Sequence, residues 1–385
     1  MQNEMRLCLN NDFILSNAKI SSNLTLRSVK KNILNTRTES TLMIDSEFLD
    51  KQRLVGDSPA DQLVAGIFNK NNQSQVYDVF KLSEADIIKK RKSSPVIAFL
   101  ADKKKNPTWF DAARMVKGQA VFESYAAEIM TLLGVLALPY CYAASPGNKA
   151  LYLSTKMRQN PHKRLTDTAE FIINVSTKGN LTDNHIGHIH INKTRLTHAI
   201  ARYYVSKGEW DKSWGVPINQ EDMAGTNLAF SYLILIGLNQ SGFVLSDQEK
   251  EDYLYLWRYI GYQLGIEEKL LPATMKQAHT LAYRIKQRNF KISQEGIVLT
   301  EELLTYYRSV APNDVARFID SQVRYYLGAE VAGYVGLEPD PIKDRITNVM
   351  NSFKEAENFL KVHKDSVELM RANHKLLKGI KNVVS

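Results

Sequence analysis

Cysteine is nearly absent from this sequence of 385 residues: Cys8 and Cys141 are the two, and neither belongs to a CxxC pair. Two cysteines are too few for the disulfide framework of a secreted protein of this length. The first residues also lack the basic start and unbroken apolar core of a secretion signal, because Asn10, Asn11 and Asp12 interrupt them. These absences favour a cytoplasmic protein in a reducing compartment.

Long apolar runs are absent too. The two nearest candidates are residues 129–144, broken by Pro139, and residues 228–238. Each is shorter than the roughly 18 to 20 unbroken apolar residues that a membrane-spanning helix requires. We therefore expect buried core helices, with a peripheral membrane contact as an open alternative.

Charge of one sign is not concentrated anywhere. Lys and Arg outnumber Asp and Glu by 50 to 41, which gives a formal net charge of +9, but the excess is spread thinly. Its densest pieces are residues 89–92, residues 103–105 and the tail from Lys361, and none is interleaved with a regular aromatic series. The sequence therefore predicts solvated basic faces and no nucleic-acid partner.

Strand patterning is scarce. Residues 185–192, HIGHIHIN, are the one short segment with period-two alternation. A helix is predicted with Asp57 or Ser58 as its N-cap and Pro59 in its first turn. Helical periodicity predicts further helices at residues 108–143, 163–177, 192–207, 220–238, 246–264, 275–289, 300–309, 315–327 and 342–378. The expected fold class is all-α, a single large multi-helix bundle.

Three parts are expected along the chain. Residues 1–44 are rich in Asn, Ser, Thr and Lys without a sustained helical period, so we interpret them as a loosely ordered N-terminal arm. Residues 45–340 form the main domain. Residues 341–385 are interpreted as a C-terminal amphipathic helix that packs on this domain through apolar residues at three- and four-residue steps. These are Ile346, Val349, Met350, Phe353, Ala356 and Leu360.

Four of the eight histidines fall within a short window. His185, His188 and His190 suggest a metal cluster, because imidazole is a common neutral metal ligand. The three have neither a nearby pair of cysteines nor a fixed helical spacing, so a polar loop is the competing interpretation. His198 differs, because it lies inside a helical segment.

The helix around His198 has two faces. Its apolar stripe contains Leu196, Ala199 and Ile200, whereas the opposite side carries His198. Arg195, Ala201 and Arg202 share the His198 side. An ordinary exposed histidine explains this pattern. So does a flat cofactor, with the imidazole on iron, Ala201 permitting close approach, and Arg195 or Arg202 available for haem propionates.

Arg164 and Thr168 lie four residues apart, which places both on one helical face. A guanidinium and a hydroxyl that face one cavity can orient a polar ligand or O2. In the alternative, a neighbouring carboxylate satisfies Arg164 and Thr168 bonds its own backbone. Further along, residues 219–222, NQED, follow Pro217 at a helix start, where such side chains cap free backbone N–H groups.

Six segments together resemble the MpaB-like proteins and latex-clearing rubber oxygenases, a family formerly known as a domain of unknown function. They are RLVGDSPAD (from Arg53), KRLTDTAEF (from Lys163), TRLTHAIAR (from Thr194), GVPINQEDMAGT (from Gly215), YLYLWRYIGYQLGI (from Tyr253) and RYYLGAEVAGYVGL (from Arg324). The resemblance spans residues 45–339. It identifies residues 45–340 as a catalytic domain with a haem pocket between its helices.

The resemblance implies a b-type haem whose proximal iron ligand is His198. Arg164 and Thr168 match a pair near the haem, on the side where O2 and substrate bind. The implied reaction is oxidative cleavage of a carbon–carbon double bond in an apolar, isoprenoid or lipid-like substrate.

The sequence departs from the rubber oxygenases at two points. Asp167 stands where their pattern has a lysine, and SPGNKALYLSTKM has no acid where they use a distal glutamate. Glu123 and Glu128 are the acids that could substitute if the helix register differs. Two alternatives to an oxygenase therefore stay open: a haem-binding sensor or carrier, and a cofactor-free helical scaffold that binds a partner or membrane through its basic C-terminal helix.

Overall fold

The structure is a computed structural model, and it describes residues 44–154, 161–183 and 185–360. The chain divides into two units, residues 1–45 and 46–385. Nearly all of the predicted N-terminal arm lies outside the described residues, as does the end of the C-terminal helix. Everything below belongs to the second unit.

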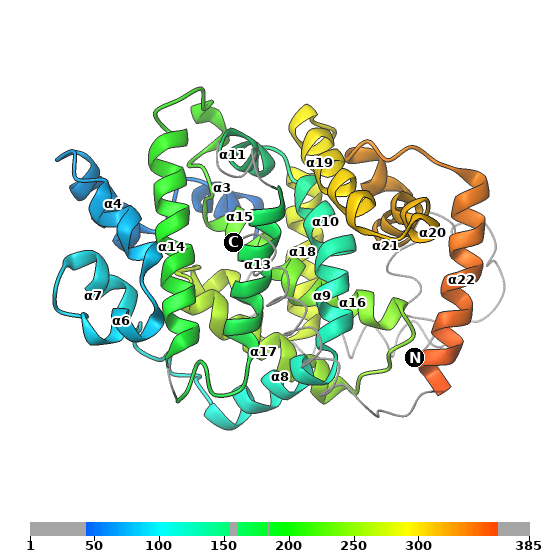
Figure 1. The fold of residues 1–385 in the computed structure, drawn as a ribbon, viewed down its shortest axis with the longest axis horizontal. Coiled ribbons are helices and arrows are strands. Elements are labelled where there is room, and N and C mark those ends of the chain that lie inside the picture. The colour runs from blue at the N-terminus through cyan, green and yellow to red at the C-terminus, as the bar shows by residue number, and fades with distance from the viewer. Residues whose placement is uncertain (1–43, 155–160, 184, 361–385) are drawn as a thin grey trace, which may run out of the picture. The chain divides into compact units, whose positions relative to one another are not determined.

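Helices account for the regular structure of the described residues (Figure 1), whose one β-bridge joins Ala144 and Phe290. The all-α prediction is confirmed. The helices are α3 (Ser46–Gln52), α4 (Ser58–Phe68), α5 (Ser74–Tyr77), α6 (Glu84–Lys89), α7 (Pro95–Ala101), α8 (Ala112–Ser124), α9 (Ala126–Leu132), α10 (Leu138–Tyr142), α11 (Gly147–Leu153), α13 (Pro161–Ser176), α14 (Ile186–Val205), α15 (Gln220–Phe230), α16 (Tyr232–Gln240), α17 (Asp247–Gln263), α18 (Met275–Asn289), α19 (Gln294–Val310), α20 (Asn313–Ala316), α21 (Ile319–Tyr334) and α22 (Pro341–Leu360).

Two sequence predictions were wrong in detail. The segment HIGHIHIN is not a strand, because α14 begins at Ile186 and runs through it. The long helix predicted over residues 108–143 is broken: α8 ends at Ser124, and the chain then bends by 78° into α9, a π-helical turn at Leu133–Ala137 and α10. Among the described helices, none alone is long and apolar enough to cross a membrane, although this bent pair passes the same test together.

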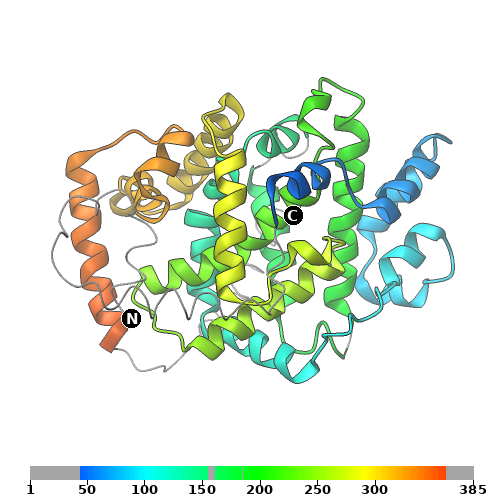
Figure 2. The same cartoon turned by 180° about the vertical axis from the view of Figure 1, so that it is seen from behind.

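Two apolar clusters form the core, and α14 lies between them. The larger cluster takes residues from α8, α9, α13, α15, α16, α17, α19 and α21. The smaller one joins α4, α5, α6 and α7 to one side of α14. Figures 1 and 2 agree on this arrangement, since in both views α4, α6 and α7 lie on the outer side of α14. Helix α14 therefore presents one face to each cluster.

Helix α22 packs on α21 through a face that the sequence did not predict. Thr347 and Asn351 are its buried residues, whereas Ile346, Val349 and Met350 are exposed. Gln322 of α21 donates a hydrogen bond to the Asn351 side chain at 3.3 Å. Polar contacts thus turn the helix away from its apolar stripe. Phe353, Ala356 and Leu360 lie beyond the side chains that the structure describes.

Candidate cofactor site around His198

His198 lies on the side of α14 that faces the larger core cluster. Ile191 belongs to that cluster, and His198 follows it by two helical turns, on the same face. The apolar stripe of Leu196 and Ala199 packs instead in the smaller cluster, as the sequence predicted. The two-faced character of this helix thus places His198 toward α13, which packs beside α14 (Figure 1).

The imidazole of His198 is half-buried, and neither ring nitrogen makes a hydrogen bond with a described residue. Burial, together with the positive charge of Arg202, lowers the pKa of His198 to about 4, although the negative charge of Asp57 opposes the shift. The ring is therefore neutral at physiological pH. A neutral imidazole with a free nitrogen lone pair is the form that binds a metal.

Arg195, one turn before His198, forms a buried ion pair with Asp57. Its Nε donates to Asp57 Oδ2 at 2.7 Å, and its Nη2 donates to Asp57 Oδ1 at 2.9 Å. Asp57 occupies the N-cap position of α4, yet its side chain makes no capping hydrogen bond, contrary to the expected capping role. Its carboxylate serves Arg195 instead.

Arg202, one turn after His198, forms the second pair. Its Nε donates to Asp61 Oδ1 at 2.7 Å, and its Nη1 donates to the carbonyl of Ile218 at 3.0 Å. Its buried Nη2 has no partner among the described residues. Gly56 leaves room for this pair, because a Cβ at this position would lie 2.7 Å from Asp61 Oδ2 and 3.1 Å from the Arg202 side chain, so both side chains would have to shift. Both arginines considered for haem propionates are thus ion-paired, and that role stays a prediction, as does that of half-buried Ala201.

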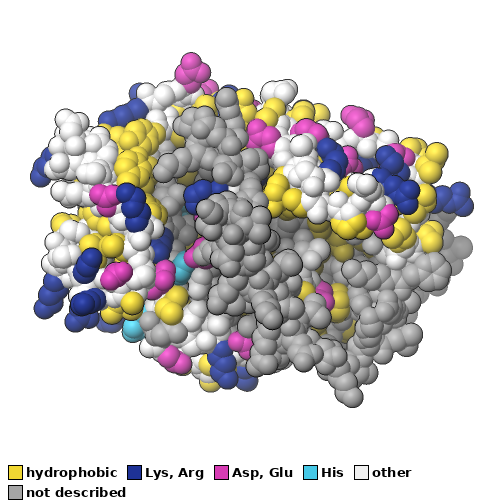
Figure 3. All heavy atoms as spheres, in the orientation of Figure 1, with side chains coloured by type: hydrophobic (Ala, Val, Ile, Leu, Met, Phe, Trp, Pro, Cys, Tyr) yellow, Lys and Arg dark blue, Asp and Glu magenta, His cyan; other side chains and the backbone are white. Residues whose placement is uncertain are grey.

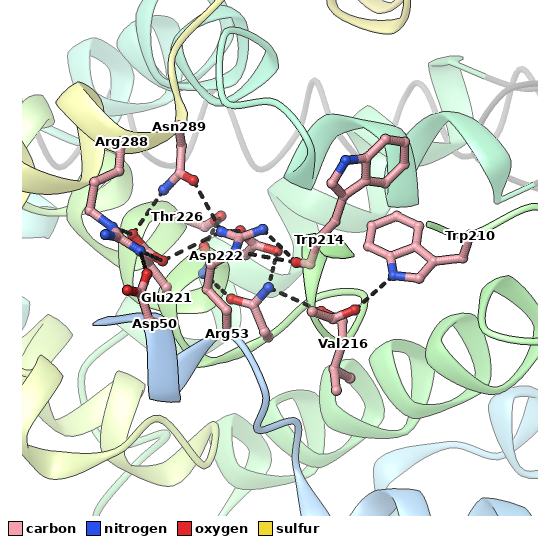
Figure 4. A network of polar contacts seen from close by, with 12 residues as sticks. Asp50, Arg53, Trp210, Trp214, Val216, Glu221, Asp222, Thr226, Arg288 and Asn289 are labelled. Carbon is pink, nitrogen blue, oxygen red and sulfur yellow. Dashed lines mark hydrogen bonds and ion pairs between the residues drawn. The ribbon is translucent and has the colours of Figure 1, made fainter. Parts of the chain in front are cut away.

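A third arginine, Arg53, joins the segment before α4 to the start of α15 (Figure 4). It lies 3.4 Å from both Glu221 Oε2 and Asp222 Oδ1, and it donates to the Asn289 side chain at 3.0 Å. Arg288 Nε donates to the fully buried Glu221 at 2.8 Å. Arg53, Arg288 and Asn289 also line a surface pocket of about 320 Å³. Acids of the NQED segment therefore hold arginines from two distant parts of the chain, the loop before α4 and the end of α18.

The start of α15 has the capping role that the sequence indicated. Asn219 Oδ1 accepts a hydrogen bond from the backbone N–H of Asp222 at 3.0 Å. Gln220 donates to the carbonyls of Gly56 and Gly265, at 2.7 and 3.0 Å. Burial raises the pKa of Asp222 to about 6, although Arg53 opposes the shift. This segment thus ties the loop before α4 to the site without facing a ligand.

Arg164 of α13 is buried, with 9% of its surface exposed. None of its three side-chain nitrogens has a hydrogen-bond partner among the described residues. Its guanidinium lies over the ring of Tyr142, 5.1 Å from the ring centre. The expected alternative, a neighbouring carboxylate that satisfies Arg164, does not occur in the described part of the chain.

Asp167 and Thr168, which lie three and four residues after Arg164 on α13, have local partners. Thr168 donates its hydroxyl hydrogen to the carbonyl of Arg164 at 2.8 Å, as the backbone-bonding alternative expected. Asp167 accepts from Lys163 at 2.8 Å on the exposed side of the helix. Of the acids considered as substitutes, Glu123 accepts from the backbone N–H of Lys178, and Glu128 lies close enough to Tyr125 to raise the pKa of its phenol.

The other histidines of α14 do not gather into a cluster. His188 Nε2 lies 3.3 Å from the Tyr259 hydroxyl, and His190 Nε2 lies 3.4 Å from Glu84 Oε1. The described residues contain no group of three or more His, Cys, Asp or Glu that could hold a metal ion. On the face seen in Figure 3, Lys and Arg are interspersed with acidic and apolar side chains.

Comparison with known proteins places this arrangement in a family. Residues 123–354 match the family described as ER-bound oxygenase mpaB/B′/rubber oxygenase, catalytic domain. The rubber oxygenase of Streptomyces sp. (strain K30) is 25% identical over 256 residues, which are 64% of this chain and 62% of that protein. This chain therefore spans less than two thirds of that relative's length.

Solved structures support the fold. A latex clearing protein structure in the closed state superposes with a TM-score of 0.65 at 20% identity, and the match covers 81% of this chain and 86% of that one. His198 and Arg164 both lie inside the matched catalytic domain, whereas Arg53, Asp57 and Asp61 precede it. The chain belongs to the oxygenase family of the mpaB/B′ proteins and the rubber oxygenases.

Proposed function

We propose that the chain is a haem-dependent oxygenase that uses O2 on an apolar, isoprenoid or lipid-like substrate, with His198 as the iron ligand. The observation that carries the proposal is the state of His198: a half-buried neutral imidazole with neither ring nitrogen engaged. A neutral imidazole with a free nitrogen lone pair, on the side of α14 that faces the larger core cluster, suits an iron porphyrin.

The neighbouring residues fit a flat cofactor with acidic side groups. Ala201 follows His198 by one turn and adds only a methyl group to that face. Arg164 supplies a buried positive charge with free donors, and Nη2 of Arg202 is a further free donor. Haem b, when bound, would supply the iron that binds and activates O2.

The remaining residues would position and shield the site. The Asp57–Arg195 and Asp61–Arg202 pairs flank His198 by one turn on each side, so they fix the rotation of α14 and the direction of the ring. The hydroxyl hydrogen of Thr168 is used by the Arg164 carbonyl, so its oxygen can only accept a further hydrogen bond. The larger apolar cluster would exclude water from an apolar substrate.

A haem-binding sensor or carrier without oxygenase chemistry is the second candidate. Asn148 is the observation that favours it, because it lies in the segment where rubber oxygenases use a distal glutamate. Its amide donates to the Tyr142 carbonyl at 2.7 Å and to Ser293 at 2.8 Å, so it is a structural group. Formation of cleavage products from long-chain alkenes under O2 would separate the two candidates, since a carrier forms none.

An absorption spectrum tests haem binding directly. The full chain, purified and reconstituted with haem, should show a Soret band, and His198→Ala should abolish or strongly shift it. His190→Gln is the matched control on the same helix, because His190 contacts Glu84, and its spectrum should equal that of the wild type. No Soret band in the wild type would rule out both haem candidates and favour the cofactor-free scaffold. An unchanged spectrum in His198→Ala would move the iron ligand elsewhere.

A further inference from the structure

Arg164 is unlike the other buried arginines of this chain. Arg195, Arg202 and Arg53 each face at least one carboxylate within 3.4 Å. Arg164 faces none among the described residues, and all three of its nitrogens are both buried and unpartnered. A buried charge without a partner strongly destabilises a folded protein, so it is retained where a ligand supplies the missing partner.

The groups beside Arg164 complete a donor site. Tyr142 is fully buried beneath the guanidinium; its hydroxyl makes no hydrogen bond of ordinary geometry with a described residue, and Arg164 is close enough to lower its pKa. Burial raises the pKa of Tyr142 to about 12, so the phenol keeps its proton and can donate it in a hydrogen bond. Guanidinium and phenol together form a set of hydrogen-bond donors with one positive charge, which matches an anionic oxygen ligand.

Charged and titratable groups from the neighbouring helix define the limits of this site. Glu302 of α19 has a buried, unpartnered Oε2, and its charge raises the pKa of the Tyr142 phenol, whereas the charge of Arg164 lowers it. Tyr307, also of α19, has its pKa raised by burial, and the charge of Arg164 reaches it as well. A single anion can therefore bind on the Arg164 side of the Tyr142 ring, and a second anion would be repelled by Glu302.

We propose that Arg164 and the Tyr142 hydroxyl form a carboxylate-binding subsite inside the helical bundle. A carboxylate matches the planar guanidinium with two parallel hydrogen bonds. Two molecules could carry it: an unsaturated long-chain carboxylic acid as substrate, or haem through a propionate. If haem is the carrier, the inference rests on the proposed function; if the long-chain acid is the carrier, the inference is independent of it. With the first carrier, the substrate class is an acid-headed chain instead of a pure hydrocarbon.

Binding measurements with matched ligands test the subsite and separate the two carriers. Oleate and oleyl alcohol are titrated into the full chain by calorimetry, with and without added haem. Haem and haem dimethyl ester, whose propionates are blocked, are titrated by absorbance. Arg164→Met should weaken oleate or haem by about tenfold or more and leave the alcohol or the ester unchanged, because only the acids form the charge-assisted pair. Tyr142→Phe should weaken the same acid less.

Lys163→Met is the matched control, because Lys163 precedes Arg164 on α13 but is exposed and paired with Asp167. It should leave all four affinities unchanged. Selective loss of oleate binding identifies the substrate as the carrier, and selective loss of haem binding identifies the propionate. The subsite is refuted if Arg164→Met weakens neither acid selectively, or if Lys163→Met weakens them equally.

Thermal unfolding of the Arg164→Met variant shows whether a loss of binding comes from a folding defect. In the ligand-free chain Arg164→Met should raise the Tm by about 2 °C or leave it unchanged, because it replaces an unpaired buried charge with an apolar side chain. A clear fall in Tm would reveal an internal partner and overturn the proposal. Failure of the Soret test at His198 would refute haem binding, whereas Arg164-dependent oleate binding needs no haem, so the two proposals fail separately.

Discussion

The buried pair between Asp57 and Arg195 offers the sharpest stability test. Asp57 is 4% exposed and Arg195 is 9% exposed, and two direct hydrogen bonds join them. Asp57→Asn keeps the size of the side chain and a good N-cap residue, but it leaves the guanidinium without a counter-charge. Removal of one partner from a buried pair costs about 3–5 kcal/mol. Since domains are stable by about 5–15 kcal/mol, the loss is a large part of the total.

Urea unfolding of the full chain, followed by circular dichroism, measures this cost. Asp167→Asn is the control, because it breaks an exposed pair with Lys163 and should cost no more than about 0.5 kcal/mol. Adding Arg195→Met to Asp57→Asn should restore part of the loss, since the double variant no longer buries a lone charge. If Asp57→Asn proves as mild as Asp167→Asn, the pair does not hold α14 and the positioning role of Asp57 is wrong.

Two further predictions concern pH and packing. Burial raises the pKa of Asp222 to about 6, above its unfolded value near 4, so the folded state favours the protonated carboxyl and loses stability as pH rises between about 4 and about 6. Urea unfolding at several pH values should show this loss in the wild type and a smaller one in Asp222→Asn; equal slopes would contradict it. Gly118→Ala should lower the Tm, because its Cβ would collide with the backbone carbonyl of Asp252 in α17, whereas Gly66→Ala meets nothing within 4 Å and should raise it slightly. Equal Tm shifts would refute this packing argument.

Local sequence signals located most helices, because N-caps and apolar periodicity depend on residues that are close together in the sequence. Helix α18 begins at Met275 and ends at Asn289, as predicted, after the cap residue Thr274. Helix α17 begins after the capping box of Ser246 and Glu249. The segment HIGHIHIN alternates like a strand although it is helical. Helix α14 is buried between the two core clusters, so Ile189 contacts one cluster and Ile191 the other. Alternating apolar residues therefore do not distinguish a strand from a helix that is buried on two sides.

Side-chain partners were harder to predict than helices. The sequence placed Arg195 and Arg202 on the His198 side, but not their acids, which lie more than one hundred residues earlier in the chain. One signal was available: Asp57 and Asp61 are one turn apart in a short acidic helix start, and acids spaced in this way can pair with a basic helix. For Arg164 the sequence offered a partner that the structure does not use. The nearest acid on its own helix, Asp167, pairs with Lys163 instead.

In this chain, residues outside the segment that matches the family contact the helix that carries His198. Asp57 and Asp61 precede residue 123, where the family match begins, yet they neutralise the two arginines that flank His198. Arg53 likewise precedes it and faces Glu221 and Asp222. Without these side chains, Arg195 and Arg202 would lose their counter-charges beside an imidazole whose pKa the charge of Arg202 already lowers. The segment 53–61 therefore contributes to the electrostatics around His198, whereas Arg164, among the buried arginines that the structure describes, pairs with no residue of this segment.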